Sequence, residues 1–137
     1  MIEVKRSPEI HILLPDRDLF WEADAVFNGC PVAAGNKIYL FYRAQASPES
    51  YDGATRSVSS VGIAESREGI HFKNRWQFLR PEYDWERYGC EDPRVTKFGG
   101  RYFIFYTAIS KYPFSPDGIK IGVAVTKDFR NIEKYPV

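Results

Sequence analysis

Metal-binding and sulfur-containing residues are scarce in this chain. It has two cysteines, one methionine and two histidines among 137 residues. Neither His11 nor His71 stands near a cysteine at the spacing of a zinc site, so no metal centre is expected. Two cysteines, here Cys30 and Cys90, in a chain without a secretion signal are more typical of free thiols than of a disulfide.

Long apolar runs and an excess of one charge are also missing. No stretch approaches the ~20 apolar residues that a membrane-spanning helix needs. The apolar start of the chain is interrupted by Pro8, Glu9 and His11, unlike a secretory signal. The net charge is +1, which indicates neither nucleic acid nor an anionic membrane as a partner. We therefore expect a cytoplasmic protein whose length suffices for one domain core.

Apolar residues at helical spacing are absent as well, whereas aromatic residues make up 16% of the chain. Aromatic side chains pack well on the pleated surface of a β-sheet, so this composition favours a β-rich fold. Such rings also stack on sugars, although packing is the more frequent role for Trp21, Trp76 and Trp85. Among these, Trp85-Glu86 is the best candidate for stacking on a sugar, because it stands just before the motif of residues 89–94 that is described below.

An internal repeat is the main architectural signal. Residues 35–44 (GNKIYLFYRA) align with residues 99–108 (GGRYFIFYTA), 64 positions later. Residues 61–66 (VGIAES) align with residues 121–126 (IGVAVT), 60 positions later, so one loop is four residues shorter in the second copy. The chain therefore contains two related units.

Each unit is predicted to consist of several short strands. Glycine-containing turns precede apolar strands, which is a hairpin signal. The predicted strands are residues 38–43 and 102–107, followed by 58–66 and 120–126, after which polar turns lead to Ile70-His71-Phe72 and to Phe129. A repeat of ~60 residues with about four strands fits one blade of a β-propeller.

Two such units cannot close a ring, because propellers have at least about four blades. We therefore predict an all-β fold that holds about two blades of a longer propeller. The expected organisation is a lead-in segment over residues 1–25, a first blade repeat over 26–88 and a second, truncated repeat over 89–137. A self-contained β-sandwich is the alternative.

The most specific motif is Gly89-Cys90-Glu91-Asp92-Pro93-Arg94. It resembles the Glu-Asp-Pro-Arg signature of glycoside hydrolase family 130, the β-mannoside phosphorylases and mannosidases. Residues 26–28 (VFN), 39–43 (YLFYR) and 62–72 (GIAESREGIHF) resemble three further segments of that family in the same order. From about Phe20 onward, the resemblance implies the N-terminal part of a five-bladed β-propeller.

Three positions depart from the family pattern. Gly29 stands where proline is frequent, Ser60 where many members have arginine, and Glu68 where aspartate is usual. These differences bear on subfamily and on linkage preference.

The resemblance implies that Asp92 is the proton donor, acting on the leaving oxygen through a sugar hydroxyl. An Asp-Pro turn that caps backbone amides is the structural alternative for this residue. Glu91 could contribute to substrate binding, although adjacent residues on a strand point to opposite faces. Arg94 is expected on the same face as Asp92, where it would pair with a carboxylate for binding or only for structure.

Asn28 lies 64 residues before Asp92 and so occupies the same place in the preceding repeat. Equivalent positions of successive blades should face one pocket, where the asparagine amide can donate to and accept from sugar hydroxyls. Arg43 offers a fork of donors to adjacent hydroxyls. The resemblance implies that both bind the sugar at the cleavage position. A turn at Asn28 and a solvent-facing charge at Arg43 are the alternatives.

The resemblance implies an enzyme that cleaves β-mannosides, and we expect inverting phosphorolysis to mannose 1-phosphate, the commoner known activity in the family. Inorganic phosphate would be the co-substrate, with no other cofactor, and one acid would suffice because phosphate is already an anionic nucleophile. The expected substrate is a β-linked manno-oligosaccharide or a mannosyl-glucose type of sugar, with β-1,4 and β-1,2 linkages both open. The sequence also leaves open whether the protein forms homo-oligomers.

Three other functions stay open. The first is a β-mannosidase of the same family, which would use water. The second is a five-bladed furanosidase, although those enzymes have a catalytic aspartate near the start of the first blade, where Asn28 stands. The third is an inactive propeller fragment with unpaired strand edges.

Overall fold

The computed structural model describes residues 11–137, so the first ten residues of the predicted lead-in segment lie outside the described part. The strands are β1 (Ala25–Ala34), β2 (Lys37–Gln45), β3 (Glu49–Tyr51), β4 (Ala54–Arg56), β5 (Ser59–Ser66), β6 (Lys73–Leu79), β7 (Gly89–Phe98), β8 (Arg101–Ile109), β9 (Ile119–Thr126) and β10 (Ile132–Pro136). The only helices in residues 11–137 are the one-turn 3-10 segments η1 (Phe20–Glu22), η2 (Asp84–Glu86) and η3 (Pro116–Gly118). None of them is long and apolar enough to cross a membrane.

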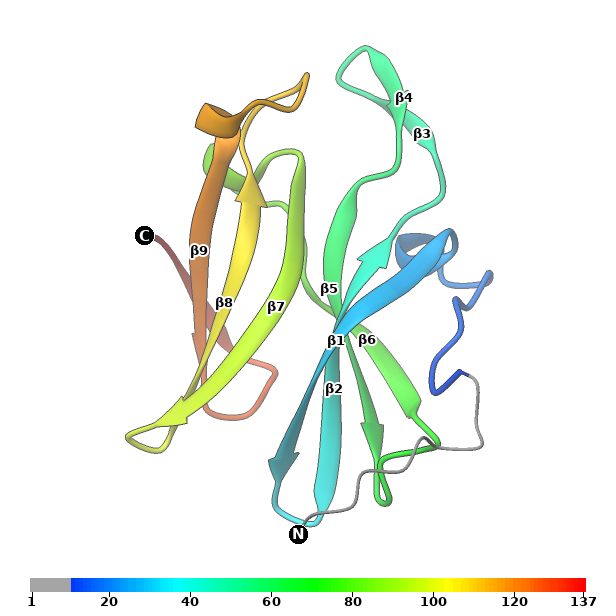
Figure 1. Ribbon diagram of the computed structural model, residues 1–137, viewed down its shortest axis with the longest axis vertical. Coiled ribbons are helices and arrows are strands. Elements are labelled where there is room, and N and C mark those ends of the chain that lie inside the picture. Colours follow the sequence, from blue (N-terminus) through cyan, green and yellow to red (C-terminus); the bar gives the residue numbers. More distant parts are fainter. Residues whose placement is uncertain (1–10) are drawn as a thin grey trace, which may run out of the picture.

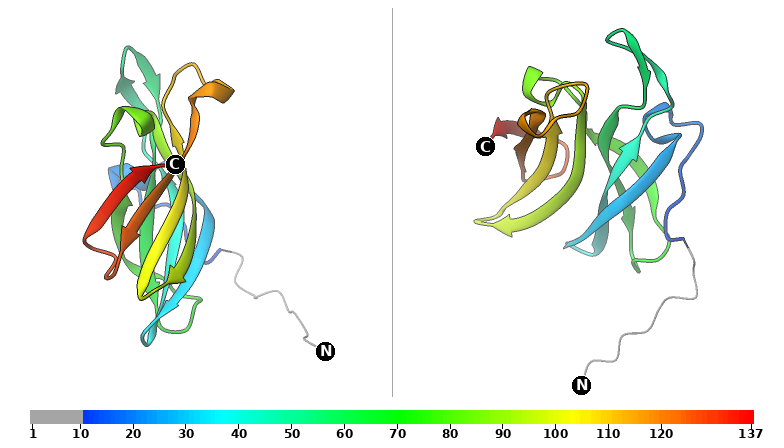
Figure 2. Two further views of the ribbon diagram at one scale, coloured as in Figure 1. Left: turned by 90° about the vertical axis from the view of Figure 1, so that its left-hand side faces the viewer. Right: turned by 45° about the horizontal axis from the view of Figure 1, so that its top comes forward.

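Eight of the strands form two antiparallel four-stranded blades that stand side by side and are joined into one sheet, while β3 and β4 form a separate two-stranded hairpin (Figures 1 and 2). The first blade has the order β1-β2-β5-β6, and the second has the order β7-β8-β9-β10. Between residues 11 and 137, one parallel residue pair, Ser59 with Gly89, is the only ladder contact that joins the two blades. The fold is thus all-β and organised in two blades, while the predicted repeat boundaries stay a prediction.

The sequence predicted the two central strands of each blade to within about two residues, but it did not predict the outer strands β6 and β10. The segments expected there, residues 70–72 and Phe129, are turns instead. The Ser66 hydroxyl accepts hydrogen bonds from the backbone N–H groups of residues 68 and 69, and Thr126 does the same for residues 128 and 129. These side-chain caps extend each turn, so the outer strand starts a few residues later.

Aromatic packing joins the blades. Phe129 reaches from the β9–β10 turn to the first blade, where its ring centroid lies 4.9 Å from that of Tyr39 and 5.2 Å from that of Phe41. Phe41 is fully buried, whereas its repeat counterpart Phe105 is 42% exposed. The second blade therefore covers the face of the first blade that carries Phe41, whereas the equivalent face of the second blade, which carries Phe105, is open. This is expected for two neighbouring blades of a longer ring.

Each blade also contains the same buried polar unit. In the first blade, Tyr42 donates a 2.6 Å hydrogen bond to Glu22, which is fully buried and pairs at 2.6 Å with Arg75. Gly62 lies against this unit, since a Cβ atom there would be 2.5 Å from Cζ of Tyr42 and 2.7 Å from Cζ3 of Trp21. The central glycine of the repeated motif is therefore required by close packing rather than by a turn.

Candidate active site

Two matched β-bulges create the site. The β1–β2 register shifts between Phe27 and Cys30, and the β7–β8 register shifts between Glu91 and Arg94. Asn28 and Asp92 occupy these bulges with φ angles of 52° and 53°. Asparagine and aspartate tolerate this left-handed region better than most residues, and such backbone strain is frequent at functional sites. The predicted equivalence of the two positions is thus visible in the backbone itself.

The bulges bring the two side chains into contact between the blades. Nδ2 of Asn28 donates a hydrogen bond of 2.6 Å to Oδ1 of Asp92. The backbone amides near Asp92 are not capped by its carboxylate in the described contacts, which removes the main support for the Asp-Pro turn reading. The Asp92 side chain is 37% exposed, so a ligand can reach it.

Arg43, near the end of β2, pairs closely with one carboxylate of the motif and lies within reach of the other. Its Nη2 atom lies 2.7 Å from Oε1 of Glu91, and its Nη1 atom lies 3.7 Å from Oδ1 of Asp92. The expectation that Glu91 and Asp92 point to opposite faces is therefore wrong. Strand alternation fails here because the bulge inserts an extra residue with positive φ.

The Glu91 carboxyl is only 16% exposed. Burial raises its pKa, while the Arg43 guanidinium and the Ser59 hydroxyl oppose the shift without cancelling it. Glu91 is thus a partly desolvated carboxyl whose charge depends on its partners. Its pairing also contradicts the reading of Arg43 as a solvent-facing charge.

The sequence missed two other partners of Arg43. The Nε atom of Arg43 donates a 3.0 Å hydrogen bond to Oγ of Ser59, and the guanidinium lies over the Phe27 ring at 4.8 Å from its centroid. The repeat gave no signal for Ser59, because Ile119 occupies that position in the second copy. Phe27 directly precedes the Asn28 bulge and could have been found as a neighbour of it.

Arg94 does not join this cluster. Its side chain is exposed, and its polar contact within residues 11–137 is a 2.9 Å hydrogen bond from Nη1 to the carbonyl of Pro93. The carboxylate pair expected for Arg94 is therefore not found among the described residues, while its predicted shared face with Asp92 stays a prediction. The structure brings together Asn28, Arg43, Glu91 and Asp92.

A family model described as beta-1,4-mannooligosaccharide phosphorylase matches residues 6–137. The chain belongs to glycoside hydrolase family 130. A beta-1,2-mannobiose phosphorylase of Thermoanaerobacter sp. (strain X514) is 37% identical over 116 residues, covering 78% of this chain and 37% of the relative. A 1,2-beta-oligomannan phosphorylase of the same organism is 31% identical, covering 100% of this chain and 46% of the relative.

The fold comparison agrees with this assignment. The structure of beta-1,2-mannobiose phosphorylase from Listeria innocua with beta-1,2-mannobiose superposes with a TM-score of 0.66 at 23% identity, covering 80% of this chain and 42% of that chain. The family 130 chain thus holds about two blades of a five-bladed β-propeller. It spans less than half the length of the two curated relatives.

The structure accounts for two of the departures from the family pattern. A Cβ atom at Gly29 would lie 2.9 Å from Cδ1 of Leu40, so Leu40 fills the space that a larger residue would need. Glu68 accepts a 2.7 Å hydrogen bond from the backbone N–H of His71, as an aspartate in a turn would. That bond is the main reason that the pKa of Glu68 falls to about 2. Ser60 is buried, and its hydroxyl has no partner in the described structure.

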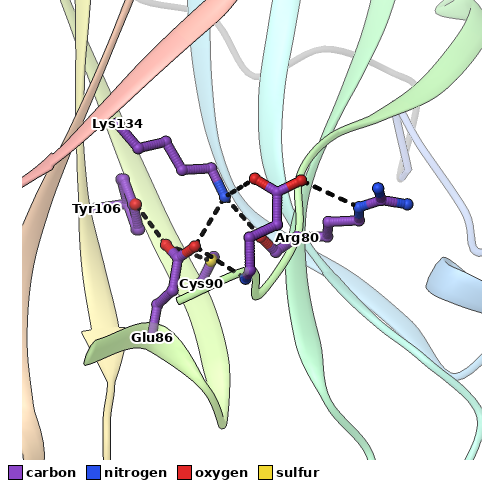
Figure 3. A network of polar contacts seen from close by, with 6 residues as sticks. Arg80, Glu86, Cys90, Tyr106 and Lys134 are labelled. Carbon is purple, nitrogen blue, oxygen red and sulfur yellow. Dashed lines mark hydrogen bonds and ion pairs between the residues drawn. The ribbon is translucent and has the colours of Figure 1, made fainter. Parts of the chain in front are cut away.

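In this family 130 chain, a second buried unit fixes the segment that leads into β7 (Figure 3). Tyr106 donates a 2.5 Å hydrogen bond to the fully buried Glu86, and the Cys90 thiol lies 3.4 Å from the same carboxylate. Lys134 of β10 pairs with Glu86 at 2.8 Å and with Glu82 at 2.9 Å. Both cysteines are free thiols, as predicted, and burial raises the pKa of Cys90 well above its usual value.

Lys134 also ties down the connection between the blades. It donates a 2.6 Å hydrogen bond to the carbonyl of Arg80, directly after β6. Trp85 packs into the same region, stacked at 5.8 Å on Tyr83 and at 6.1 Å from Tyr106. The possible sugar-stacking role of Trp85-Glu86 is therefore not supported, because both side chains serve blade packing. This unit positions the start of the strand that carries Glu91 and Asp92.

The β3–β4 hairpin joins the end of β2 to the start of β5, next to the site, and projects beyond both sheets (Figure 1). It contacts the second blade through Tyr51, whose hydroxyl donates to the carbonyl of Arg87 at 3.0 Å, and through an Asp52–Tyr88 hydrogen bond. The Arg56 guanidinium lies over the Tyr112 ring at 3.7 Å. These contacts form a rim across the seam between the blades.

In residues 11–137, no three His, Cys, Asp or Glu side chains gather as a metal-binding group.

Proposed function

We propose that this chain supplies the sugar-binding and proton-donating part of the active site of a β-mannoside phosphorylase, with Asp92 as the proton donor. The observation that carries the proposal is the asymmetry of the Asp92 carboxyl. Oδ1 is held by Asn28 and faces Arg43, whereas Oδ2 has no protein partner among the described residues. A half-exposed acid with one anchored and one free oxygen is suited to hand a proton to a ligand.

The proposed reaction is a single displacement. The bond between the anomeric carbon and the bridging oxygen breaks, and the proton held by Asp92 passes to that oxygen, directly or through a sugar hydroxyl. A phosphate oxygen attacks the anomeric carbon from the opposite face and forms the new bond. The products are α-mannose 1-phosphate and the released sugar, and solvent or dihydrogen phosphate returns the proton to Asp92.

Phosphorolysis rather than hydrolysis is proposed because the two curated relatives are named as phosphorylases. Glu91, the carboxylate that shares Arg43 with Asp92, is paired with the arginine and is not assigned the water-activating role that an inverting hydrolase needs. A phosphorylase needs no such group, because phosphate is itself the nucleophile.

We propose β-1,2-linked manno-oligosaccharides as the first substrates to test, because both relatives carry that linkage in their names. β-1,4-Mannosides are the second choice, on the description of the family model. Asn28 and Arg43 would bind the mannose that is transferred. The furanosidase alternative is weakened, because its aspartate position at the start of the first blade is taken by Asn28 within a bulge that matches that of Asp92.

The test uses the complete natural protein that contains this chain, with β-1,2- and β-1,4-mannobiose, in the presence and absence of phosphate. The expected result is mannose 1-phosphate that forms only with phosphate, and a loss of about 10²–10⁴-fold in kcat for Asp92→Asn, the range of a general acid. Asp24→Asn is the matched control, since Asp24 is an exposed aspartate near the start of the first blade. Free mannose without phosphate would make the enzyme a hydrolase, and no product from either mannobiose in a folded protein would favour the furanosidase reading.

A further inference from the structure

Arg43 has two carboxylates within reach but pairs closely with one. Its guanidinium lies 2.7 Å from Glu91 and 3.7 Å from Asp92. Both carboxylates attract the same cation, so attraction alone does not select between them. Something else must hold the guanidinium plane in the orientation that favours Glu91.

Ser59 is the residue that fixes this orientation. It is 2% exposed and accepts a 3.0 Å hydrogen bond from Nε of Arg43, the nitrogen nearest the side-chain stem. Nε bound to Ser59, Nη2 at Glu91 and the Phe27 ring under the guanidinium together restrict its rotation. The same hydroxyl acts on Glu91, where it lowers the pKa that burial raises.

The backbone of Ser59 is held in place where the two blades meet. Among the described residues, it forms the one ladder pair between the blades, with Gly89. A Cβ atom added at Gly89 would lie 3.6 Å from Cβ of Ser59 and 3.4 Å from Oε1 of Glu91, so these groups share one small space. Ser59 comes from the first blade and Glu91 from the second. The Ser59 hydroxyl therefore links the contact between the blades to the carboxylates of the site.

Resting on the proposed function, we infer that Ser59 is a positioning residue: it holds the Arg43 guanidinium on Glu91 and thereby leaves the Asp92 carboxyl free to carry and donate its proton. The role is indirect, because the Ser59 hydroxyl is buried and does not itself reach a sugar. Loss of the hydroxyl frees the guanidinium to move toward Asp92 and removes a donor that stabilises the Glu91 carboxylate. The groups that face Glu91 are Arg43 from β2, Ser59 from β5 and Asp92 on its own strand.

The test compares Ser59→Ala with Ser60→Ala in the complete protein. Ser60 is the matched control, since it is the next residue, is also 2% exposed and has a hydroxyl without a partner in the described structure. We expect Ser59→Ala to lower kcat about tenfold or more, the usual size of a lost hydrogen bond to a charged group. Without the hydroxyl, Glu91 gains its proton at higher pH, so the acidic limb of the kcat/KM profile moves to higher pH. Ser60→Ala should leave kcat and the limb unchanged.

Two further measurements keep the outcome decisive. Thermal unfolding shows whether each variant is folded, and Ser59→Cys, which has similar volume but a weak donor and acceptor, replaces the alanine variant if that one does not fold. A carbon-13 NMR titration of the Glu91 carboxyl reads the coupling without any reaction. An unchanged Glu91 titration in a folded Ser59 variant overturns the inference. A shifted titration in a protein that phosphorolyses no mannoside supports the coupling and rejects the proposed function instead.

Discussion

Lys134 is the residue whose replacement tests the blade architecture most directly. Its side chain is 2% exposed, and its ammonium group contacts two carboxylates, of Glu86 and Glu82, and the carbonyl of Arg80. Burial alone would lower the pKa of Lys134, but its hydrogen bonds with Glu86 and Glu82 outweigh burial and raise it. We consider the change Lys134→Met, which keeps most of the apolar stem and removes the charge.

Lys134→Met is expected to lower the free energy of unfolding because it leaves the buried carboxylate of Glu86 without its cation. Glu86 is fully buried, and without Lys134 its partners in the described part of the chain are the hydroxyl of Tyr106, the thiol of Cys90 and the backbone N–H of Glu82. Removing one partner of a buried ion pair costs about 3–5 kcal/mol. Because the Glu86 amide analogue would be neutral, the double variant Lys134→Met, Glu86→Gln should recover most of that loss.

Urea unfolding followed by fluorescence of the tryptophans measures the effect, with a midpoint that falls while the slope m stays constant. Lys127→Met is the control, since Lys127 lies exposed in a turn and should change stability by less than about 0.5 kcal/mol. A loss of under about 1 kcal/mol for Lys134→Met, or no recovery in the double variant, would refute the reasoning, because the pair would then be dispensable for the blade. The contribution of Lys134 to the free energy of unfolding also depends on pH in a defined direction. Because the pKa of Lys134 is raised in the folded state, this contribution is present at neutral pH and is lost only as pH rises above 10.5 through the folded-state pKa.

Two other predictions follow from the repeat. Gly122→Ala would place a Cβ atom 2.5 Å from Cζ of Tyr106, so we expect a loss of about 1–3 kcal/mol in the same unfolding assay, and an unchanged midpoint would contradict the close packing. Asn28→Asp would place a second carboxylate at the 2.6 Å contact with Asp92, so the two acids should share one proton to higher pH. The alkaline limb of the kcat profile should move upward and KM for mannobiose should rise; a profile identical to that of the unmodified protein would rule out the contact.

The sequence predicted the parts of the fold that repeat. The segments around Tyr42 and Tyr106 align because both strands must pack the same tyrosine against the same glycine and buried glutamate. The outer strands were missed because their cations differ, Arg75 in one blade and Lys134 in the other, and because side-chain caps lengthen the preceding turns. Local pattern carries little information about strands whose pairing is set by such non-local contacts.

The candidate site was predicted unevenly for a related reason. Asp92 was found through the resemblance of its motif to the family signature, and Asn28 through the repeat that places it at the equivalent position of the first blade. Glu91 was given the wrong face, because strand alternation was carried through a bulge that the sequence does not reveal. The carboxylate pair predicted for Arg94 is not found among the described residues. Ser59 was not found at all, since its role depends on a contact between blades that has no counterpart in the second copy.

The two bulges explain how a repeated blade can yield an asymmetric active site. The backbone bends in the same way at both positions, and each bulge aims a short polar side chain at the seam. If both positions carried aspartate, two carboxylates would meet at a distance where they share a proton. With asparagine in the first blade, the contact becomes a donor to Oδ1 of Asp92, and the other oxygen stays available for a substrate. The difference of one residue between equivalent positions therefore lets an asparagine amide hold one oxygen of Asp92, and the roles proposed for the two residues rest on this arrangement.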